Sequence, residues 1–361
     1  MIVDSIMLEN YRNYKSLEIS FDAGTNILYG DNAQGKTNVL EAIYVSSTTK
    51  SHRGSKDREM ISFDLDEAHI KTIFLKNDIR YRIDVHLRKS KAKGIAINGI
   101  PIKKASELFG IVNVVFFSPE DLNIIKDGPS QRRRFVDMEL CQLDKIYVNN
   151  LINYNKTINQ RNKLLKDMYQ DNTLLSTLDI WDMQLEKYGI EVIKRRKQFV
   201  DELNEIIGDI HSKLTGGKET LTVIYEPSVA EDEFAKSLIL NRDRDLKMKT
   251  TMQGPHRDDI SFVIKGNDIR KYGSQGQQRT AALSLKLSEI ELVKRITKDT
   301  PILLLDDVLS ELDSNRQNYL LNSINNIQTI ITCTGLDEFV NNRFNIDKIY
   351  KVVNGIINNE N

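Results

Sequence analysis

The chain has little cysteine, no long apolar run and no net charge, and each absence excludes a class of protein. Its two cysteines, Cys141 and Cys333, show neither a metal-ligand spacing nor a disulfide framework, so we predict two buried thiols. No charged-then-apolar leader follows Met1, and no apolar run approaches the roughly 20 residues of a membrane span. We therefore expect a cytoplasmic protein that is neither secreted nor inserted in a membrane.

Positively and negatively charged side chains are equally numerous. Lys and Arg together number 51, and Asp and Glu together also number 51. Such a chain carries no global positive field that would attract nucleic acid. Any DNA-binding surface must therefore be local.

The patterning predicts an α/β chain of two lobes. At 361 residues the chain is long enough for two lobes with a substantial core. Residues 1 to about 115 alternate short strand-like runs with turn signals such as Asn98-Gly99. We assign residues 1–118 and 250–361 to an ATP-binding head and residues 119–249 to an inserted, mainly helical lobe.

Apolar residues with helical spacing dominate the inserted lobe. They recur three and four positions apart from Leu140 to Met168 and again from Trp181 to Ile210, which predicts two long helices in an antiparallel hairpin joined near residues 170–178. About 30 residues of helix span roughly 45 Å, far too little for long coiled-coil arms. We interpret the apolar stripe as the hairpin's own core, with a partner-binding face as the alternative.

A phosphate loop is predicted at residues 30–37, between an expected strand at 25–29 and an expected helix at 38–45. Its glycines let backbone N–H groups converge on phosphates, Lys36 adds a charge at the β- and γ-phosphates, and the Thr37 hydroxyl is a ligand for Mg²⁺. The alternative is an ordinary glycine turn before a helix. The residues predicted to bind ATP are Gly30, Asp31, Asn32, Ala33, Gln34, Gly35, Lys36 and Thr37, with Lys36 also catalytic.

Two carboxylates follow a second apolar run. Residues 302–305 are typical of a buried parallel strand, which delivers Asp306 and Asp307 to its C-terminal edge. We predict that Asp306 holds Mg²⁺, directly or through water, and that Asp307 is the catalytic base that orients the attacking water. Without the phosphate loop, a solvated strand end would be the simpler interpretation.

A second anion site is predicted at residues 273–277, ahead of an expected helix from Arg279 to Arg295. Backbone N–H groups and a serine hydroxyl at a helix N-terminus favour an anion, and we predict that Ser274, Gly276 and Gln277 contact the nucleotide. One chain does not need two phosphate cradles for one nucleotide. The segment resembles the signature loop of ABC-type ATPases, where the loop of one subunit closes on the γ-phosphate held by the other, so we expect an ATP-dependent homodimer.

Taken together, the motifs resemble the RecF family, the small SMC-like ATPases of bacterial recombinational repair, along nearly the whole chain. The segments that carry the resemblance are Leu8 to Tyr14, Gly30 to Ile43, Ser51 to Arg53, Phe117 to Leu122, Pro129 to Phe135, Gly254 to Asp259, Gly273 to Gln277, and Ile302 to Asp313. One departure is Ala33, where such loops commonly place glycine. Alanine carries little steric cost there unless the residue needs a positive φ, so we expect binding to survive.

The resemblance implies an ABC/SMC-type ATPase head without a long coiled coil. It further implies a dimeric clamp on gapped or junction DNA that helps RecO and RecR load RecA and supports the SOS response. Asp307 is one methylene shorter than glutamate, which predicts slow ATP hydrolysis coupled to dimer opening. Two alternatives remain: the nucleotide-binding subunit of an ABC-type transporter and the head of a nuclease-associated SMC-like complex.

Three basic clusters are candidates for DNA contact, because a few phosphate contacts produce salt-dependent, largely sequence-independent binding. The first cluster, on an expected hairpin turn, is Arg88, Lys89, Lys91 and Lys93. The second begins a helix and could equally bridge the lobes; it is Arg132, Arg133 and Arg134. The third, on the helical hairpin, is Lys194 to Lys197, and the alternative for each cluster is a solvated face.

Two other sets of residues have two interpretations each. Arg12 and Arg53 either contact nucleotide or form ion pairs at the surface. The segment from His256 to Asp259 could supply metal ligands or acid and base groups, but we favour an ion-paired strand end near the nucleotide interface, since no histidines or carboxylates elsewhere show a complementary spacing.

Overall fold

The computed structural model describes residues 1–167, 177–336 and 346–360, which form two compact units. Unit 1 comprises Met1–Asp121 and Leu285–Asn361, and unit 2 comprises Leu122–Ser284. The first boundary lies close to the predicted 118. The second differs from the predicted 250, because strand β10 pairs with strand β9 and so draws residues after 250 into the helical unit. The functional division of the chain into head and insertion stays a prediction.

The first sheet of unit 1 is antiparallel, with strand order β2-β1-β4-β5-β6-β7 among the described residues. Burial alternates along β4 and β5, as expected of strands with one solvated face. Helix α1 (Lys36–Thr48) contacts the sheet at β1, β4 and β5. The strands are β1 (Ile2–Tyr11), β2 (Tyr14–Ser20), β4 (Glu67–Lys76), β5 (Ile79–Arg88), β6 (Gly94–Ile97) and β7 (Ile100–Pro101).

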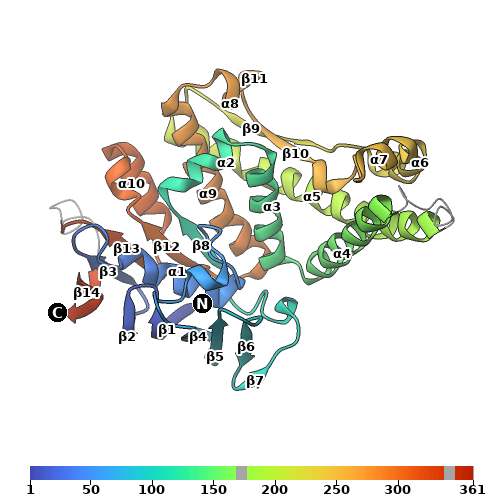
Figure 1. Ribbon diagram of the computed structural model, residues 1–361. Coiled ribbons are helices and arrows are strands. Elements are labelled where there is room, and N and C mark those ends of the chain that lie inside the picture. Colours follow the sequence, from blue (N-terminus) through green and yellow to red (C-terminus); the bar gives the residue numbers. More distant parts are fainter. Residues whose placement is uncertain (168–176, 337–345, 361) are drawn as a thin grey trace. The chain divides into compact units, whose positions relative to one another are not determined.

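The second sheet of unit 1 has strand order β15-β14-β3-β13-β12-β8 (Figure 1). The strands from β14 to β8 are parallel, and β15 closes an antiparallel hairpin with β14. Helix α1 follows β3 and helix α10 (Ser314–Ser323) follows β12. Parallel strands end at one edge, so the C-terminal residues of β3, β13 and β12 meet there. The strands are β3 (Thr25–Tyr29), β8 (Val114–Phe117), β12 (Ile302–Asp306), β13 (Thr329–Cys333), β14 (Ile346–Val353) and β15 (Ile356–Asn359).

Unit 2 is mainly helical and carries a small antiparallel sheet of order β11-β10-β9. Helix α9 begins in unit 2 and ends in unit 1. The elements are α2 (Leu122–Lys126), α3 (Pro129–Leu143), α4 (Lys145–Asp167), α5 (Leu178–Leu214), β9 (Leu221–Glu226), α6 (Phe234–Leu240), α7 (Arg242–Met248), β10 (Asp259–Ile264), β11 (Asn267–Asp268), α8 (Ile269–Tyr272) and α9 (Gln275–Thr297).

The predicted helical hairpin is present as α4 and α5. The pair is antiparallel, since Arg161 near the end of α4 meets Asp182 near the start of α5, and Asp144 just before α4 meets Arg195. The first predicted helix is in fact two: α3 ends at Leu143, and the Asp144 carboxylate accepts the N–H groups of Ile146 and Tyr147 and so starts α4. The predicted joint at 170–178 lies mostly outside the described residues.

The hairpin's apolar stripe is its own core, as predicted. Tyr154, Ile158, Leu185 and Ile193 are buried together with Phe234 of α6. Cys141 is buried as predicted, whereas Cys333 at the end of β13 is only partly buried, which corrects the prediction for that thiol. None of the helices within the described residues is both long and apolar enough to cross a bilayer.

Candidate nucleotide-binding site

Residues 30–35 form a loop that joins strand β3 to helix α1, and Lys36 and Thr37 begin that helix, where the motif predicted a phosphate loop. Gly30 has φ 151° and Gly35 has φ 113°. A Cβ on Gly30 would collide with the Val352 carbonyl oxygen, and one on Gly35 would lie 2.5 Å from Asn13 Nδ2. Both positions therefore require glycine.

Ala33 has a positive φ, which the sequence alone could not reveal. Its φ is 65°, in the left-handed region that costs an L-residue about 1–2 kcal/mol. The condition under which alanine carries a steric cost is therefore met.

Three groups converge at the edge of the parallel sheet. Lys36 Nζ donates to the carbonyl oxygens of Gly30 at 2.6 Å and Asp31 at 2.9 Å. Thr37 Oγ1 donates to Asp306 Oδ1 at 2.7 Å, which joins the start of α1 to the end of β12. The phosphate loop and the Asp306 carboxylate thus meet, as the two motifs predicted.

The site has the donor set that Mg²⁺ binds. Adjacent ligands of an octahedral Mg²⁺ with bonds of 2.0–2.1 Å lie about 2.9 Å apart, close to the 2.7 Å between Thr37 Oγ1 and Asp306 Oδ1. Both are hard oxygen ligands. Among the described residues no side chain caps the N-terminus of α1, so its N–H groups suit a phosphate.

Thr332, at the end of β13, organises the two carboxylate residues. Its hydroxyl donates to Asp306 Oδ1 at 2.7 Å, and its Oγ1 accepts the Asp307 N–H at 3.1 Å. Asp307 itself has φ 52°. The sequence analysis missed Thr332; the available signal was the run of β-branched residues from Thr329 to Thr332, which is typical of a strand.

Further contacts hold the phosphate loop from outside. Asn13 Nδ2 donates to the Gln34 carbonyl at 2.9 Å, and Tyr14 Oη donates to the Gly35 carbonyl at 3.1 Å. The turn between β14 and β15 also reaches the loop, because the Gly355 N–H donates to the same Gln34 carbonyl at 3.2 Å. Residues from two segments that are distant in sequence therefore fix the loop's backbone.

Arg12 forms an ion pair, as the second interpretation of this residue predicted, but its partner Glu41 is buried, so the pair does not lie at the surface. Its guanidinium donates to both carboxylate oxygens of Glu41, at 2.8 and 2.7 Å. Burial raises the pKa of Glu41, but hydrogen bonds from Arg12 and Ser51 outweigh it and hold that pKa below its ordinary value. Arg53 is exposed.

Beside the loop lies a hollow of about 870 Å³, within unit 1. Its lining includes Arg12, Asn13 and Asn38, which are close to the phosphate loop, and Phe63, whose side chain is 95% exposed. The hollow is large enough for a small ligand.

The predicted second anion site lies at the start of α9, in unit 2. The Ser274 Oγ accepts the Gln277 N–H at 3.2 Å, and the Gln277 side chain accepts the Ser274 N–H at 2.9 Å, which is a reciprocal helix cap. Ser274 and Gly276 are exposed. An oxygen that accepts one hydrogen bond can still donate its own proton to a phosphate.

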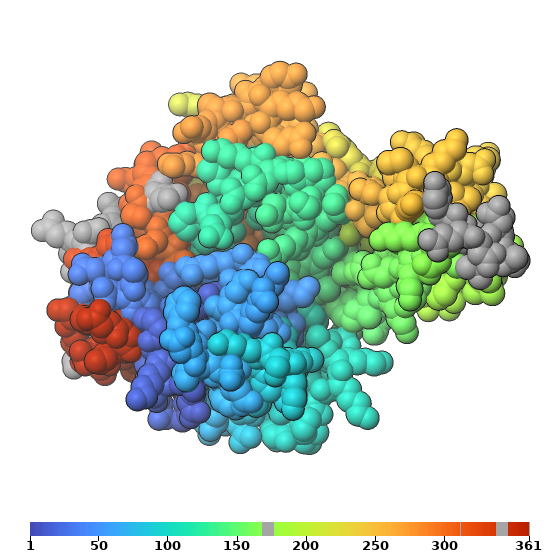
Figure 2. All heavy atoms as spheres, viewed as in Figure 1, coloured from blue at the N-terminus to red at the C-terminus, as the bar shows by residue number. Residues whose placement is uncertain are grey.

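The candidate DNA residues differ in accessibility. Lys89 and Lys91 are exposed in the β5–β6 turn, whereas Arg88 donates to the Ala92 carbonyl and Lys93 to Asp57 and Thr49. Residues of this region, light blue to cyan, lie on the surface in Figure 2. Because β5 and β6 pair antiparallel on either side of these residues, the expected hairpin turn is present.

Arg132 is too buried to contact DNA, which corrects the prediction for this residue. It is 2% exposed, and both arms of its guanidinium bond the Asp259 carboxylate, at 2.6 and 2.9 Å. Arg133 donates to the Asp258 carbonyl, and burial lowers its pKa. In the third cluster, Arg196 is buried between Asp137 and Asp258. These arginines lie on helix faces that pack inward. A run of consecutive basic residues does not show which of its members will face inward.

The segment from His256 to Asp259 forms an ion-paired strand end, as we favoured. Asp258 pairs with Arg196, and Asp259 at the start of β10 pairs with Arg132. His256 Nδ1 lies 2.7 Å from Tyr154 Oη, and His256 Nε2 lies 3.0 Å from the Thr251 carbonyl. Because a carbonyl only accepts, Nε2 carries a proton. Burial lowers the pKa of His256 to about 4, so the imidazole is neutral at pH 7.

The fold and the site define a P-loop ATPase head of the ABC/SMC type. The sequence profile described as the RecF/RecN/SMC N terminal domain matches residues 2–358. Two full-length relatives named DNA replication and repair protein RecF are 66% identical (Lachnospira eligens, 100% of both chains) and 68% identical (Agathobacter rectalis, 98% of both chains). The chain belongs to the RecF family.

Solved structures agree with this placement. A structure of the recombination mediator protein RecF with ATP, from the RecFOR pathway, is 36% identical with a TM-score of 0.94, covering 99% of this chain and 97% of the other. The Smc head domain of Pyrococcus furiosus, at 16% identity and a TM-score of 0.57 over 99% of this chain and 95% of that one, shares the fold. Neither the transporter nor the nuclease-associated alternative is favoured.

Proposed function

We propose that this chain is an ATP-binding protein of recombinational DNA repair that closes on DNA as an ATP-gated dimer. The observation that carries the proposal is the meeting of the phosphate loop with the end of β12, where Thr37 Oγ1 and Asp306 Oδ1 are 2.7 Å apart. The names of the full-length relatives support the repair role. The SMC-like architecture supports the ATPase activity.

Each residue of the head has a distinct role in this proposal. The loop N–H groups and Lys36 bind the phosphates, with Lys36 released from the carbonyls of Gly30 and Asp31 to do so. Thr37 and Asp306 hold Mg²⁺, which when bound neutralises charge that develops on the phosphates. Asp307 orients the attacking water, and Thr332 fixes the backbone of Asp307 through the Asp307 N–H.

The nucleoside is proposed to occupy the hollow beside the loop. Asn13 and Asn38, which are hydrogen-bonded to each other at 2.8 Å, line it and offer amide groups to the ribose and base. The exposed Phe63 ring offers an apolar surface. Such a mixture of polar and apolar groups is typical of small-molecule sites.

The second copy is proposed to contribute residues 274–277. Ser274, Gly276 and Gln277 stand exposed or partly exposed at the start of α9, where a helix N-terminus favours the γ-phosphate of a neighbour. Hydrolysis removes that phosphate and lets the dimer open. A short Asp307 side chain, rather than glutamate, holds the water less firmly and makes turnover slow.

DNA is proposed to contact Lys89 and Lys91, the exposed lysines of the β5–β6 turn. Their sequence neighbours Arg88 and Lys93 already bind protein groups, as does Arg133 on α3. Contacts of this kind bind the backbone of gapped or junction DNA without reading its sequence. RecO, RecR and, downstream, RecA are the proposed partners, in the cytoplasm.

Light scattering tests the proposal. The molar mass of the purified protein is measured without nucleotide, with Mg-ADP and with Mg-ATP, for the wild type and a Ser274→Arg variant. We expect a dimer only with Mg-ATP and only in the wild type. A wild-type monomer with bound Mg-ATP, both with and without gapped DNA, would contradict the clamp.

A further inference from the structure

Two histidines and a glutamate share the solvated face of the antiparallel sheet in unit 1. His69 of β4 pairs directly with His86 of β5, and Glu67 lies two residues before His69 on β4. Alternate residues of a strand share a face, and directly paired residues share it too. The residues between them, Ala68 and Leu87, are buried on the opposite face.

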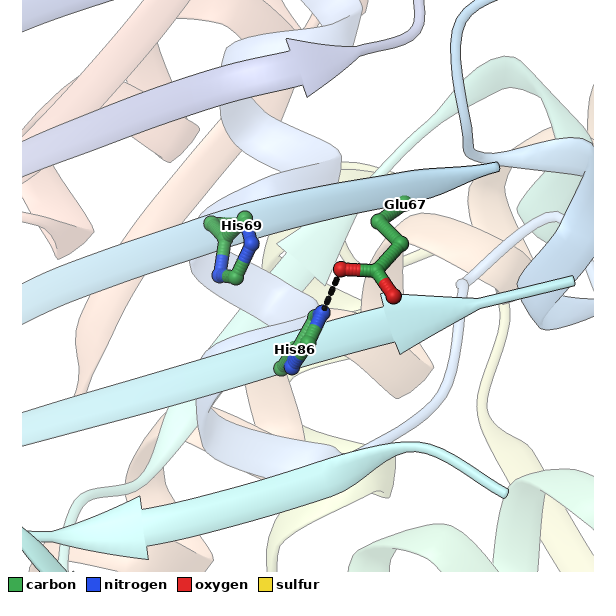
Figure 3. Close-up of side chains that lie close together, drawn as sticks. All are labelled: Glu67, His69 and His86. Atoms are coloured by element: carbon green, nitrogen blue, oxygen red, sulfur yellow. Dashed lines mark hydrogen bonds and ion pairs between the residues drawn. The ribbon is translucent and has the colours of Figure 1, made fainter. Parts of the chain in front are cut away.

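The three side chains converge, as Figure 3 shows. One ligand atom from each lies within 4.8 Å of the others. His86 Nε2 is 2.8 Å from Glu67 Oε2, and the two imidazole rings stack with centroids 4.0 Å apart.

We propose that Glu67, His69 and His86 bind a transition metal ion, with Zn²⁺ as the best fit. Two imidazole nitrogens and one carboxylate oxygen are a donor set that zinc accepts, and Mg²⁺ avoids imidazole. Donors around a tetrahedral Zn²⁺ with bonds of 2.0–2.1 Å lie about 3.3 Å apart. In the proposed site, rotation of the two exposed side chains, Glu67 and His69, and of the partly exposed His86 brings the donor atoms to that spacing.

The surroundings leave room for a fourth ligand. Glu9 of β1 pairs with His69 on its other side, so the register runs from Glu9 through His69 to His86 across three strands. Glu9 is exposed and adds negative charge, which offsets the positive charge of Arg88 opposite Glu67. Water occupies the fourth position in the proposed site.

A metal at this place would join β4 to β5 just before the turn that carries Lys89 and Lys91. The site is separate from the nucleotide's Mg²⁺ ligands, Thr37 and Asp306, and the inference does not depend on the proposed function. Without metal, the same cluster is a cross-strand contact at the surface.

Calorimetric titration with Zn²⁺ alone tests the site. The full-length protein is first freed of metal with a chelator, and millimolar Mg²⁺ is present throughout. We expect one Zn²⁺ per chain, bound at least about tenfold more weakly by His69→Ala and by His86→Ala. Glu18→Gln, on β2 of the same sheet, is the matched control and keeps the wild-type affinity.

Thermal melting with and without Zn²⁺ provides a second measurement. We expect Zn²⁺ to raise the melting temperature of the wild type and of Glu18→Gln, and not of the double variant His69→Ala/His86→Ala, whose own melting temperature without metal shows that it folds. Absence of saturable binding below about 100 μM would overturn the proposal. So would stoichiometric binding that survives in the double variant.

Discussion

Ala33 is a single residue whose backbone conformation opposes its side chain. Its φ of 65° is one that glycine adopts without steric cost. The phosphate loop holds the residue there because Gly30, Gly35 and the contacts from Asn13 determine the path of the chain on either side. The steric cost of Ala33 is therefore stored in the loop.

An Ala33→Gly variant should be more stable than the wild type. The relief of about 1–2 kcal/mol exceeds the extra entropy that glycine loses on folding, about 0.5–1 kcal/mol. We expect the melting temperature to rise by about 2 °C, measured by circular dichroism. Gly35→Ala, at φ 113° and with its Cβ close to Asn13, should lower it. Destabilisation by Ala33→Gly would show that the loop is not strained at this position.

His256 makes the stability of unit 2 depend on pH. Burial lowers its pKa to about 4, against about 6.5 in the unfolded chain. The unfolded state therefore takes up the proton first as the pH falls, and stability is lost between pH 6.5 and 4. The loss amounts to about 3 kcal/mol at most.

A His256→Gln variant should remove that part of the pH dependence. Glutamine can donate to the Thr251 carbonyl and accept from Tyr154, so the folded state keeps both hydrogen bonds. Urea unfolding at pH 7 and at pH 4.5 measures the difference. An unchanged difference between the two pH values would mean that other groups cause the acid sensitivity.

At the scale of the elements, the α4–α5 hairpin is joined to α7 by one buried arginine. Arg161 of α4 is 0% exposed and donates to Asp182 of α5 and Asp245 of α7, each at 2.7 Å. It also donates to Thr251 at 2.8 Å. One side chain thus ties together three segments that are distant in sequence.

Arg161→Met should destabilise unit 2 strongly. It leaves the buried Asp245 carboxylate without its cationic partner, and loss of one member of a buried ion pair costs about 3–5 kcal/mol. Lys194→Ala, which removes an exposed lysine 4.0 Å from Glu191, should cost less than about 0.5 kcal/mol. Denaturant unfolding followed by tryptophan fluorescence compares them, since Trp181 lies on α5. Equal effects of the two variants would contradict the role of Arg161.

At the scale of the whole molecule, the elements proposed for catalysis fall in different units. The phosphate loop and Asp306 belong to unit 1, and residues 274–277 belong to unit 2 at the start of α9. The proposed dimer brings each unit 2 loop to the nucleotide of the other copy. Two different defects should therefore complement each other.

Mixing two inactive variants should restore ATP hydrolysis. Lys36→Met removes the lysine proposed to bind phosphate, and Ser274→Arg blocks the loop proposed to enter the partner's site, so neither variant alone assembles an active site. In a mixed dimer one site carries both defects and the other carries neither. We expect partial recovery, at most about half of the wild-type rate in an equimolar mixture, because a mixed dimer holds one intact site of two. No recovery, with each variant folded, would indicate that both elements act within one chain.

The sequence by itself determined the phosphate loop, the strand that delivers Asp306, the helical hairpin and the family. These features depend on consecutive residues or on short periods, which local chain geometry translates directly into structure. The tertiary structure alone decided that Ala33 takes a positive φ, that Thr332 organises Asp306 and Asp307, and that Arg132 and Arg196 turn inward. It also brought Glu67, His69 and His86 together. Such outcomes depend on strand register and on which helix face packs, and both are set by residues far apart along the chain.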